Sequence, residues 1–147
     1  MKANGAILLV EDDSTDIFLM KRMFAQAQIT QQLFVAVNGT EAINFLINAD
    51  ASHHPDKNPL PQLILLDLKL PLKSGLQVLE WIRGQPLIKR IPVIVFTSSL
   101  DRSDVNGAYD LGANGYFLKT GSLETMRELV ALWRDHWLIH NQNPDLT

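Results

Sequence analysis

Short runs of apolar residues alternate with amphipathic segments along most of the chain. Five runs have the composition of β-strands: Ala6–Val10, Leu33–Val37, Leu63–Leu66, Val93–Thr97 and Tyr116–Leu118. The first, third and fourth are continuously apolar, which is typical of central strands covered on both faces. Strands that alternate with helices form βα units around a parallel sheet. The pattern predicts an α/β protein with one doubly wound, five-stranded parallel sheet.

The segments between the strands carry apolar residues at spacings of three and four, the period of a helix packed on one face. In the first of them, Ile17, Met20 and Phe24 share a face. This periodicity predicts five helices, over Ser14–Gln28, Glu41–Asn48, Ser74–Arg83, Asp101–Leu111 and Ser122–His140. Gly112 stands where a left-handed residue would end the fourth helix.

Two segments depart from the βα pattern. Ala49–Pro61 (ADASHHPDKNPLP) is polar and rich in proline, which predicts a surface loop. Residues Asn141–Thr147 are predicted to be a flexible tail, leaving residues 1–140 as one domain. The core face of the last helix is predicted to comprise Met126, Val130, Trp133 and Trp137. Leu129 and Leu132 add a second apolar flank to this helix, which indicates an interface.

Composition narrows the function classes. The 147 residues are 46% hydrophobic and 20% charged, with a net charge of -3 and no cysteine. The absence of cysteine excludes disulfides and thiolate metal sites. Without a basic run, nucleic acid and anionic membranes are not expected as partners. No stretch approaches the about 20 apolar residues of a membrane helix, so we expect a cytoplasmic protein.

Polar side chains gather where the predicted strands end. Glu11 and Asp12 follow the first strand, and Asp67 follows the third. The fourth strand ends in Thr97, and Lys119 follows the fifth. Ligands bind at the carboxyl ends of the strands in open parallel sheets, so these side chains are expected to meet at one edge.

This set of residues suits phosphoryl chemistry. Clustered carboxylates repel one another unless a cation neutralises them, and Mg²⁺ prefers oxygen ligands. A carboxylate such as Asp67 can attack phosphorus and form an aspartyl phosphate. A lysine and a hydroxyl would then neutralise charge on the transferred group.

Four sequence blocks resemble the motifs of response-regulator receiver domains from two-component signalling. They are ILLVEDD (Ile7–Asp13), LILLDLKLP (Leu63–Pro71), PVIVFTSS (Pro92–Ser99) and GANGYFLKT (Gly112–Thr120). Their order and spacing match from Ala6 to about Leu138. The resemblance implies a flavodoxin-like receiver fold with strand order 2-1-3-4-5, in which residues 1–140 form the receiver domain.

The resemblance also implies a role for each residue of the metal site. Asp67 would be the phosphoacceptor and would bind Mg²⁺ together with Glu11 and Asp12. Lys69 would offer its backbone carbonyl to the metal. Asp13 is interpreted as a helix cap rather than a ligand.

The remaining motif residues would bind the phosphoryl group and respond to it. Thr97 and Lys119 would hold phosphoryl oxygens, and Tyr116 resembles the switch aromatic that moves inward with Thr97. Two positions depart from the family. Lys69 occupies a variable site that influences phosphoryl lifetime, and Thr120 replaces the usual proline after the lysine.

The function implied is that of a signalling switch rather than an enzyme, with self-phosphorylation and self-dephosphorylation as its only chemistry. A sensor histidine kinase would phosphorylate Asp67, and the output would be a downstream protein or a phosphorelay partner. No output domain is expected in this chain. The long segment before the third strand and the aromatic-rich end resemble stand-alone receivers paired with cyanobacterial phytochrome-type kinases. A homodimer through the fourth helix, fifth strand and fifth helix is expected.

Two other functions share this fold class. A haloacid-dehalogenase-type phosphatase also uses a strand-end aspartate, but it needs a second aspartate where Lys69 stands. A phosphate-independent, flavodoxin-like binding module needs a Gly/Ser/Thr-rich turn after the first strand, where Glu11, Asp12 and Asp13 stand instead. The histidines, at positions 53, 54, 136 and 140, are expected to face solvent.

Overall fold

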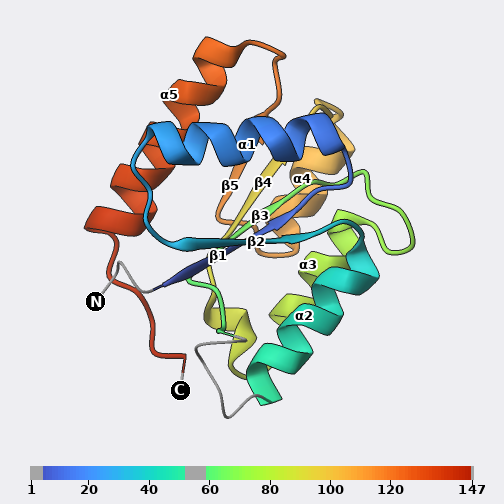
Figure 1. The fold of residues 1–147 in the computed structure, drawn as a ribbon. Coiled ribbons are helices and arrows are strands. Elements are labelled where there is room, and N and C mark those ends of the chain that lie inside the picture. Colours follow the sequence, from blue (N-terminus) through green and yellow to red (C-terminus); the bar gives the residue numbers. More distant parts are fainter. Residues whose placement is uncertain (1–4, 52–58, 147) are drawn as a thin grey trace.

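A computed structural model describes residues 5–51 and 59–146 of the chain, and its centre is a parallel sheet (Figure 1). The strands are β1 (Ala6–Val10), β2 (Gln32–Ala36), β3 (Leu63–Leu66), β4 (Val93–Thr97) and β5 (Gly115–Leu118). They lie in the order β2-β1-β3-β4-β5, which confirms the predicted fold class and topology. Val10 at the end of β1 pairs with Ala36 and Leu66, so these strands end level with one another.

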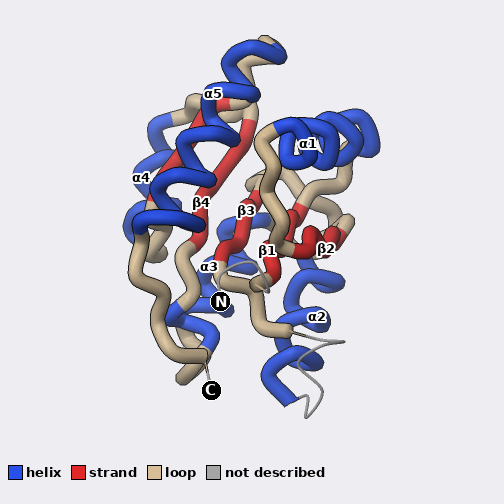
Figure 2. Tube along the Cα trace, turned by 60° about the vertical axis from the view of Figure 1, so that its left-hand side comes forward, coloured by secondary structure: helices blue, strands red, loops and turns tan. Residues whose placement is uncertain are grey.

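Helices cover both faces of the sheet, as Figures 1 and 2 show. They are α1 (Ser14–Gln26), α2 (Gly39–Ala51), α3 (Gly75–Arg83), α4 (Arg102–Asp110) and α5 (Leu123–Trp133). Helices α1 and α5 pack on one face, and α2 and α3 pack on the other, with α4 beside α3. A short 3-10 helix, η2 (Ile88–Arg90), precedes β4, and a π-helical turn, η3 (Arg134–His140), follows α5.

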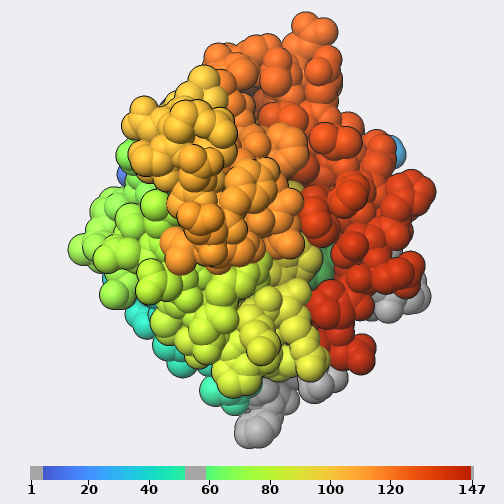
Figure 3. All heavy atoms as spheres, turned by 180° about the vertical axis from the view of Figure 1, so that it is seen from behind, coloured from blue at the N-terminus to red at the C-terminus, as the bar shows by residue number. Residues whose placement is uncertain are grey.

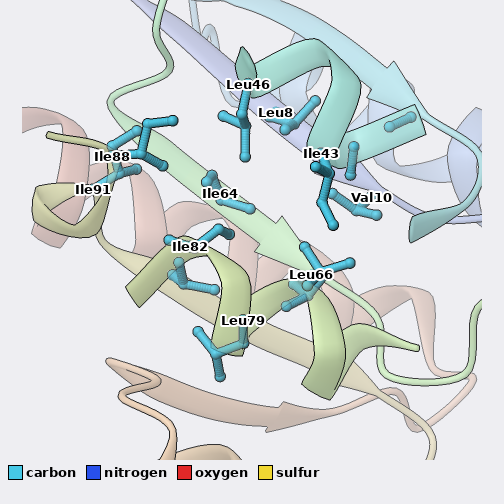
Figure 4. Packing of buried hydrophobic residues seen from close by; sticks show 14 residues of the cluster. Leu8, Val10, Ile43, Leu46, Ile64, Leu66, Leu79, Ile82, Ile88 and Ile91 are labelled. Atoms are coloured by element: carbon cyan, nitrogen blue, oxygen red, sulfur yellow. The ribbon is translucent and has the colours of Figure 1, made fainter. Parts of the chain in front are cut away.

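Alternate side chains of the central strands supply two separate cores. Every residue of β1, β3 and β4 is buried, because helices cover both faces of these strands. Figure 4 shows the core beneath α2 and α3, where Leu8 and Ile64 of the sheet meet Leu46 and Ile82 of the helices. On the opposite face the buried indole of Trp133 lies edge-on to Phe96, with ring centroids 5.2 Å apart.

Helix α1 ends two residues earlier than predicted. Gln28 adopts a left-handed conformation with φ of 58°, and the amide of Ile29 donates to the carbonyl of Phe24. This is the arrangement of a Schellman cap, which usually uses glycine at the left-handed position. Because a glutamine fills that position here, composition did not mark the end of the helix.

Helix α2 is longer than predicted at both ends. Its start is capped by Asn38, whose side-chain oxygen accepts from the amide of Glu41 at 2.7 Å. Its end at Ala51 takes in the beginning of the predicted loop Ala49–Pro61. Positions 52–58 of that loop, including His53 and His54, lie outside the described residues.

The last helix is not regular throughout, contrary to the prediction for Ser122–His140. Regular α-helix stops at Trp133, and the amide of Asn141 donates to the carbonyl of His136, five residues back. A π-turn spaces side chains more widely than an α-turn. The core therefore buries Leu138, five residues after Trp133, while Trp137 is only partly buried.

Residues 141–146 make contacts at the end of the sheet where the strands begin. Arg90 donates to the carbonyl of Asp145 at 3.0 Å, and Leu146 packs against the core beneath α2 and α3. The flexibility predicted for residues 141–147 is a property of their motion, and static contacts do not measure motion. It therefore stays a prediction. Within residues 5–51 and 59–146, no helix is long and apolar enough to cross a membrane.

Candidate functional site

Three carboxylates converge at the carboxyl edge of the sheet. Glu11 and Asp12 follow β1, and Asp67 follows the neighbouring strand β3. One oxygen from each lies within 4.8 Å of the others. Glu11 and Asp67 are 3% and 7% exposed, whereas Asp12 faces solvent. The sequence-based expectation that residues 11, 12 and 67 meet at one edge is therefore confirmed.

Local hydrogen bonds give the three consecutive acidic residues different orientations. Asp13 caps α1, and its carboxylate accepts from the amide of Asp16 at 2.9 Å. The Glu11 carboxylate accepts from the amide of Asp13 at 3.1 Å and turns inward. The interpretation of Asp13 as a helix cap is confirmed. Asp12 is left pointing toward the open side of the site.

The Asp67 carboxylate is held by backbone and by a cation. Its Oδ1 accepts from the amides of Leu68 and Lys69 at 2.7 and 3.4 Å, and its Oδ2 accepts from Lys119 at 3.0 Å. The start of α3 packs directly behind it. A Cβ at Gly75 would lie 2.2 Å from the Asp67 carbonyl oxygen, so this approach requires glycine.

The Lys119 ammonium lies at the centre of the site. It contacts the carboxylates of Glu11, Asp16 and Asp67, with Nζ–Oδ2 distances of 2.9 Å to Asp16 and 3.0 Å to Asp67. The contact with Asp16 was not predicted from the sequence. The available signal was its spacing, because Asp16 comes four residues after Asp12, in the first turn of α1.

Burial and charge shift the proton affinities of this group. Burial, reinforced by the Asp67 charge, raises the pKa of Glu11 to about 7, although its hydrogen bond to Lys119 opposes the shift. Burial lowers the pKa of Lys119, but hydrogen bonds to Glu11 and Asp16 outweigh it, so the net shift is upward. The lysine is therefore a permanent cation among acidic groups.

A hydrogen-bonded chain links Lys69 to the neighbourhood of Tyr116. Lys69 pairs with Asp104 of α4 at 3.5 Å, and the Ser99 hydroxyl donates to the same carboxylate at 2.5 Å. The hydroxyl of Tyr116 donates to the Ser99 carbonyl at 2.7 Å. Thr97 is fully buried at the end of β4, and its hydroxyl has no partner among the described residues.

The acidic group opens into a cleft of about 710 Å³ between the starts of α1 and α5. Asp12, Asp67 and Lys119 line its polar end. Thr97 does not line the cleft and lies beneath the surface. The peptide bond from Lys119 to Thr120 is trans, and Gly121 after it has a φ of 80°. Asp67 is therefore reached from solvent through this cleft.

These residues suit a magnesium ion. The donors are carboxylate oxygens from Glu11, Asp12 and Asp67, close enough together to share one cation. Mg²⁺ binds through one or two carboxylates and completes its coordination with waters and phosphate oxygens. Exposed Asp12 lies on the open side, where such additional ligands have room. The donor set therefore fits the predicted metal.

The fold and this acidic edge define an open α/β domain with a candidate metal site at the carboxyl ends of its strands, and sequence comparison identifies the family. The profile of the response regulator receiver domain matches residues 7–131. The chain therefore belongs to the response regulator receiver family of two-component signalling, whose members are signalling proteins that interact with histidine kinases.

Named relatives agree with this assignment. Response regulator Rcp1 of Synechocystis sp. is 37% identical over 132 residues, which covers 90% of this chain and 88% of Rcp1. The probable methanogenesis regulatory protein FilR2 of Methanothrix harundinacea is 33% identical over 138 residues, covering 94% of this chain and 86% of FilR2.

Solved structures of receiver proteins share this fold. The phosphorylated cyanobacterial phytochrome response regulator RcpA superposes with a TM-score of 0.85 at 34% identity, covering 97% of this chain and 99% of RcpA. The Mn²⁺-bound form of Rcp1 superposes with a TM-score of 0.84 at 35% identity, covering 96% of this chain and 99% of that structure. The predicted similarity to cyanobacterial phytochrome response regulators is therefore confirmed.

Proposed function

We propose that this chain accepts a phosphoryl group on Asp67 from a sensor histidine kinase, in a Mg²⁺-dependent reaction, and thereby changes a protein-interaction surface. One observation carries this function above all. The Asp67 carboxylate lies within 4.8 Å of both Glu11 and Asp12 and also receives a hydrogen bond from Lys119. A nucleophile, a metal-binding group and a fixed cation thus share one cleft.

The transfer itself requires one bond to form and one to break. A carboxylate oxygen of Asp67 attacks the phosphorus of a phosphohistidine, and the phosphorus–nitrogen bond breaks as the new oxygen–phosphorus bond forms. The electron pair returns to the imidazole nitrogen, which takes a proton from solvent. When bound by Glu11, Asp12, Asp67 and the backbone carbonyl of Lys69, Mg²⁺ supplies positive charge for the phosphoryl oxygens.

Lys119 and Thr97 would hold the transferred group. Lys119 already donates to Asp67 and needs to move little to reach a phosphoryl oxygen. The buried Thr97 hydroxyl lacks a partner, and the arrival of a strong acceptor would give it one. Movement of Thr97 toward the phosphoryl group would free space beside it, into which Tyr116 would turn from its bond to Ser99.

The surface that would respond is formed by α4, β5 and α5, which lie together on the face seen in Figure 3. Apolar side chains exposed on these elements support its use by a partner or by a second copy of the chain. They are Tyr109 of α4 and Leu123 and Leu132 of α5, with Ile139 in the adjoining η3. Similarity to RcpA and Rcp1 favours a phytochrome-type kinase as the phosphoryl donor.

Intact mass after incubation with acetyl phosphate tests the proposed reaction. With Mg²⁺ the chain should gain one phosphoryl group, and with a chelator it should gain none. Asp67→Asn, which keeps the shape of the acceptor but not its nucleophile, should stay unmodified under both conditions. Lys119→Ala should still accept phosphate, but the accompanying change around Tyr116, followed by NMR, should weaken.

Two results would contradict the function. One is phosphorylation of Asp67→Asn at the wild-type rate, which would assign the acceptor role to another residue. The other is turnover of many equivalents of a stable phosphomonoester, which would favour a phosphatase.

A further inference from the structure

We propose that Asp16 is a positioning residue for phosphoryl transfer, because it holds the Lys119 ammonium at the cleft while Glu11 and Asp67 serve the metal and the phosphoryl group. This role rests on the phosphoacceptor function proposed above. The observation behind it is the contact between the Asp16 carboxylate and Lys119 Nζ, at 2.9 Å.

The hydrogen-bonding capacity of the lysine is fully used. An ammonium group has three N–H donors. Among the described residues, three carboxylates receive them, those of Glu11, Asp16 and Asp67. A phosphoryl oxygen can therefore bind Lys119 only if one of these contacts is released.

The three carboxylates that contact Lys119 differ in whether they would also bind the metal or the phosphoryl group. Glu11 and Asp67 both belong to the acidic group that can share a metal ion, whereas Asp16 does not. Phosphorylation also converts the Asp67 carboxylate into an acyl phosphate, which moves the negative charge available to Lys119 from the carboxylate to the phosphoryl oxygens. Asp16 is thus the partner whose bond to the lysine can persist through metal binding and phosphorylation.

The position of Asp16 is set by the start of α1. Its backbone amide donates to the capping carboxylate of Asp13, which fixes the first helical turn. Its side chain is 32% exposed, and that of Lys119 is 13% exposed. A partly buried pair between fixed elements is screened less by solvent than a surface pair.

Removing the Asp16 charge would change how the Lys119 ammonium is shared among the neighbouring carboxylates. The ammonium would be left with Glu11 and Asp67 as its charged partners, so it would compete more strongly for the nucleophile and for a metal-binding oxygen. Asp16→Asn should therefore slow phosphorylation even though Asp16 contacts no reacting atom.

A double-mutant cycle on the phosphorylation rate tests this role. With acetyl phosphate and Mg²⁺, Asp16→Asn should be slower than wild type on the order of 5–10-fold, within the usual range of coupling between contacting residues. In a Lys119→Met background the same substitution should change the rate less than twofold. If Lys119→Met reacts too slowly, affinity for beryllofluoride, a phosphoryl mimic, replaces the rate in all four proteins.

Three controls separate positioning from other effects. Asp13→Asn removes an equal charge nearby and keeps a capping side chain, so it should leave the rate unchanged. Asp16→Glu keeps the charge and should recover most of the rate. The melting temperature of Asp16→Asn should stay well above the assay temperature, so that the slower reaction cannot come from unfolding.

The outcomes distinguish the positioning role of Asp16 from the phosphoacceptor function on which it rests. An equal effect of Asp16→Asn with and without Lys119, or no effect at all, overturns the positioning role while the phosphoacceptor function stands. A wild-type chain that takes no phosphoryl group overturns both.

Discussion

Single residues at the acidic edge have properties that depend on burial more than on residue type. Glu11, Asp12 and Asp67 are all carboxylates, yet Glu11 is turned inward, Asp12 is open to solvent and Asp67 is held by two amides. Desolvation penalises the charged form of a carboxylate. Burial therefore disfavours ionisation of Glu11, although its hydrogen bond to Lys119 opposes the effect.

The raised pKa of Glu11 predicts a pH dependence of stability. Because this pKa is about 7 in the folded chain, against an ordinary value of 4.5, the folded state binds the proton more tightly than the unfolded state. In metal-free buffer, the contribution of Glu11 to the free energy of unfolding should be greatest below pH 4.5. It should then fall as the pH rises through 7.

Urea unfolding of wild type and Glu11→Gln at pH 5 and pH 8 measures this effect. Glutamine imitates the protonated side chain, so the variant should gain stability relative to wild type at pH 8 but not at pH 5. Glu80→Gln, at an exposed position on α3, serves as the control. A difference between wild type and Glu11→Gln that is the same at both pH values would contradict the explanation.

The sequence allowed most of the residues at this edge to be predicted, but not all of their contacts. Residues 11, 12 and 67 follow strands, so the topology brings them together whatever their side chains do. Asp16 lies inside α1, and its direction depends on the rotation of the helix about its axis. That rotation is set by tertiary packing, which periodicity describes only coarsely.

Individual elements are joined by a small number of specific contacts, of which Arg83 makes several. Its guanidinium donates to the carbonyls of Gly112 and Ile91 and to the side chain of Asn114. It thus ties the end of α3 to the turn after α4. Gly112 has a φ of 94°, which confirms the predicted left-handed position.

Two glycines near α4 should respond to alanine in opposite ways. At Gly112 an added Cβ would lie 2.8 Å from Arg83 Nε, on a backbone that alanine rarely adopts. Gly112→Ala should therefore lower the free energy of unfolding by about 1–3 kcal/mol. At Gly107, within α4, an added Cβ would lie 3.7 Å from the Leu76 side chain, an ordinary contact. Gly107→Ala should raise the free energy of unfolding by about 0.5–1 kcal/mol.

Chemical denaturation of both variants checks this pair. Wild type provides the reference, and both substitutions add the same methyl group. Equal effects of the two changes would show that local backbone conformation does not govern stability at these sites.

Element boundaries were harder to predict than the elements themselves. Helix α2 begins at Gly39, inside the dipeptide Asn38-Gly39, which is typical of turns, although here Asn38 acts as a cap. The change to π geometry after Trp133 has no composition signal, because it depends on where Leu138 can reach the core. Boundaries of this kind are decided by contacts between segments distant in sequence.

Across the whole molecule, the predicted sheet was correct because its central strands are apolar on both faces. Buried runs such as Leu63–Leu66 leave few alternatives to a sheet covered by helices on both sides. The oligomeric state is a property at the same scale. It depends on the exposed apolar side chains of α4, α5 and η3 rather than on the core.

Sedimentation velocity tests the proposed dimer through α4, β5 and α5. The wild-type chain, or its beryllofluoride complex, should show the mass of a dimer at micromolar concentration. Leu132→Lys, on the exposed flank of α5, should shift it toward the monomer because a charge would enter the apolar contact. Ile47→Lys, at a similarly exposed position on α2, should not. A monomer mass at every concentration in both forms would exclude the dimer.

Helix α1 is attached to the β5–α5 part of the chain at both of its ends, and this has a mechanical consequence. Near its last turn, Arg134 donates to the carbonyl of Ala27 at 3.0 Å, a bond remote from the acidic edge. Its first turn is tethered through Asp16 to Lys119. With 13 residues the helix is about 20 Å long, so a force on its first turn would tilt it about the contact at Ala27. A displacement of about 1 Å at the first turn is then equivalent to a tilt of roughly 3°.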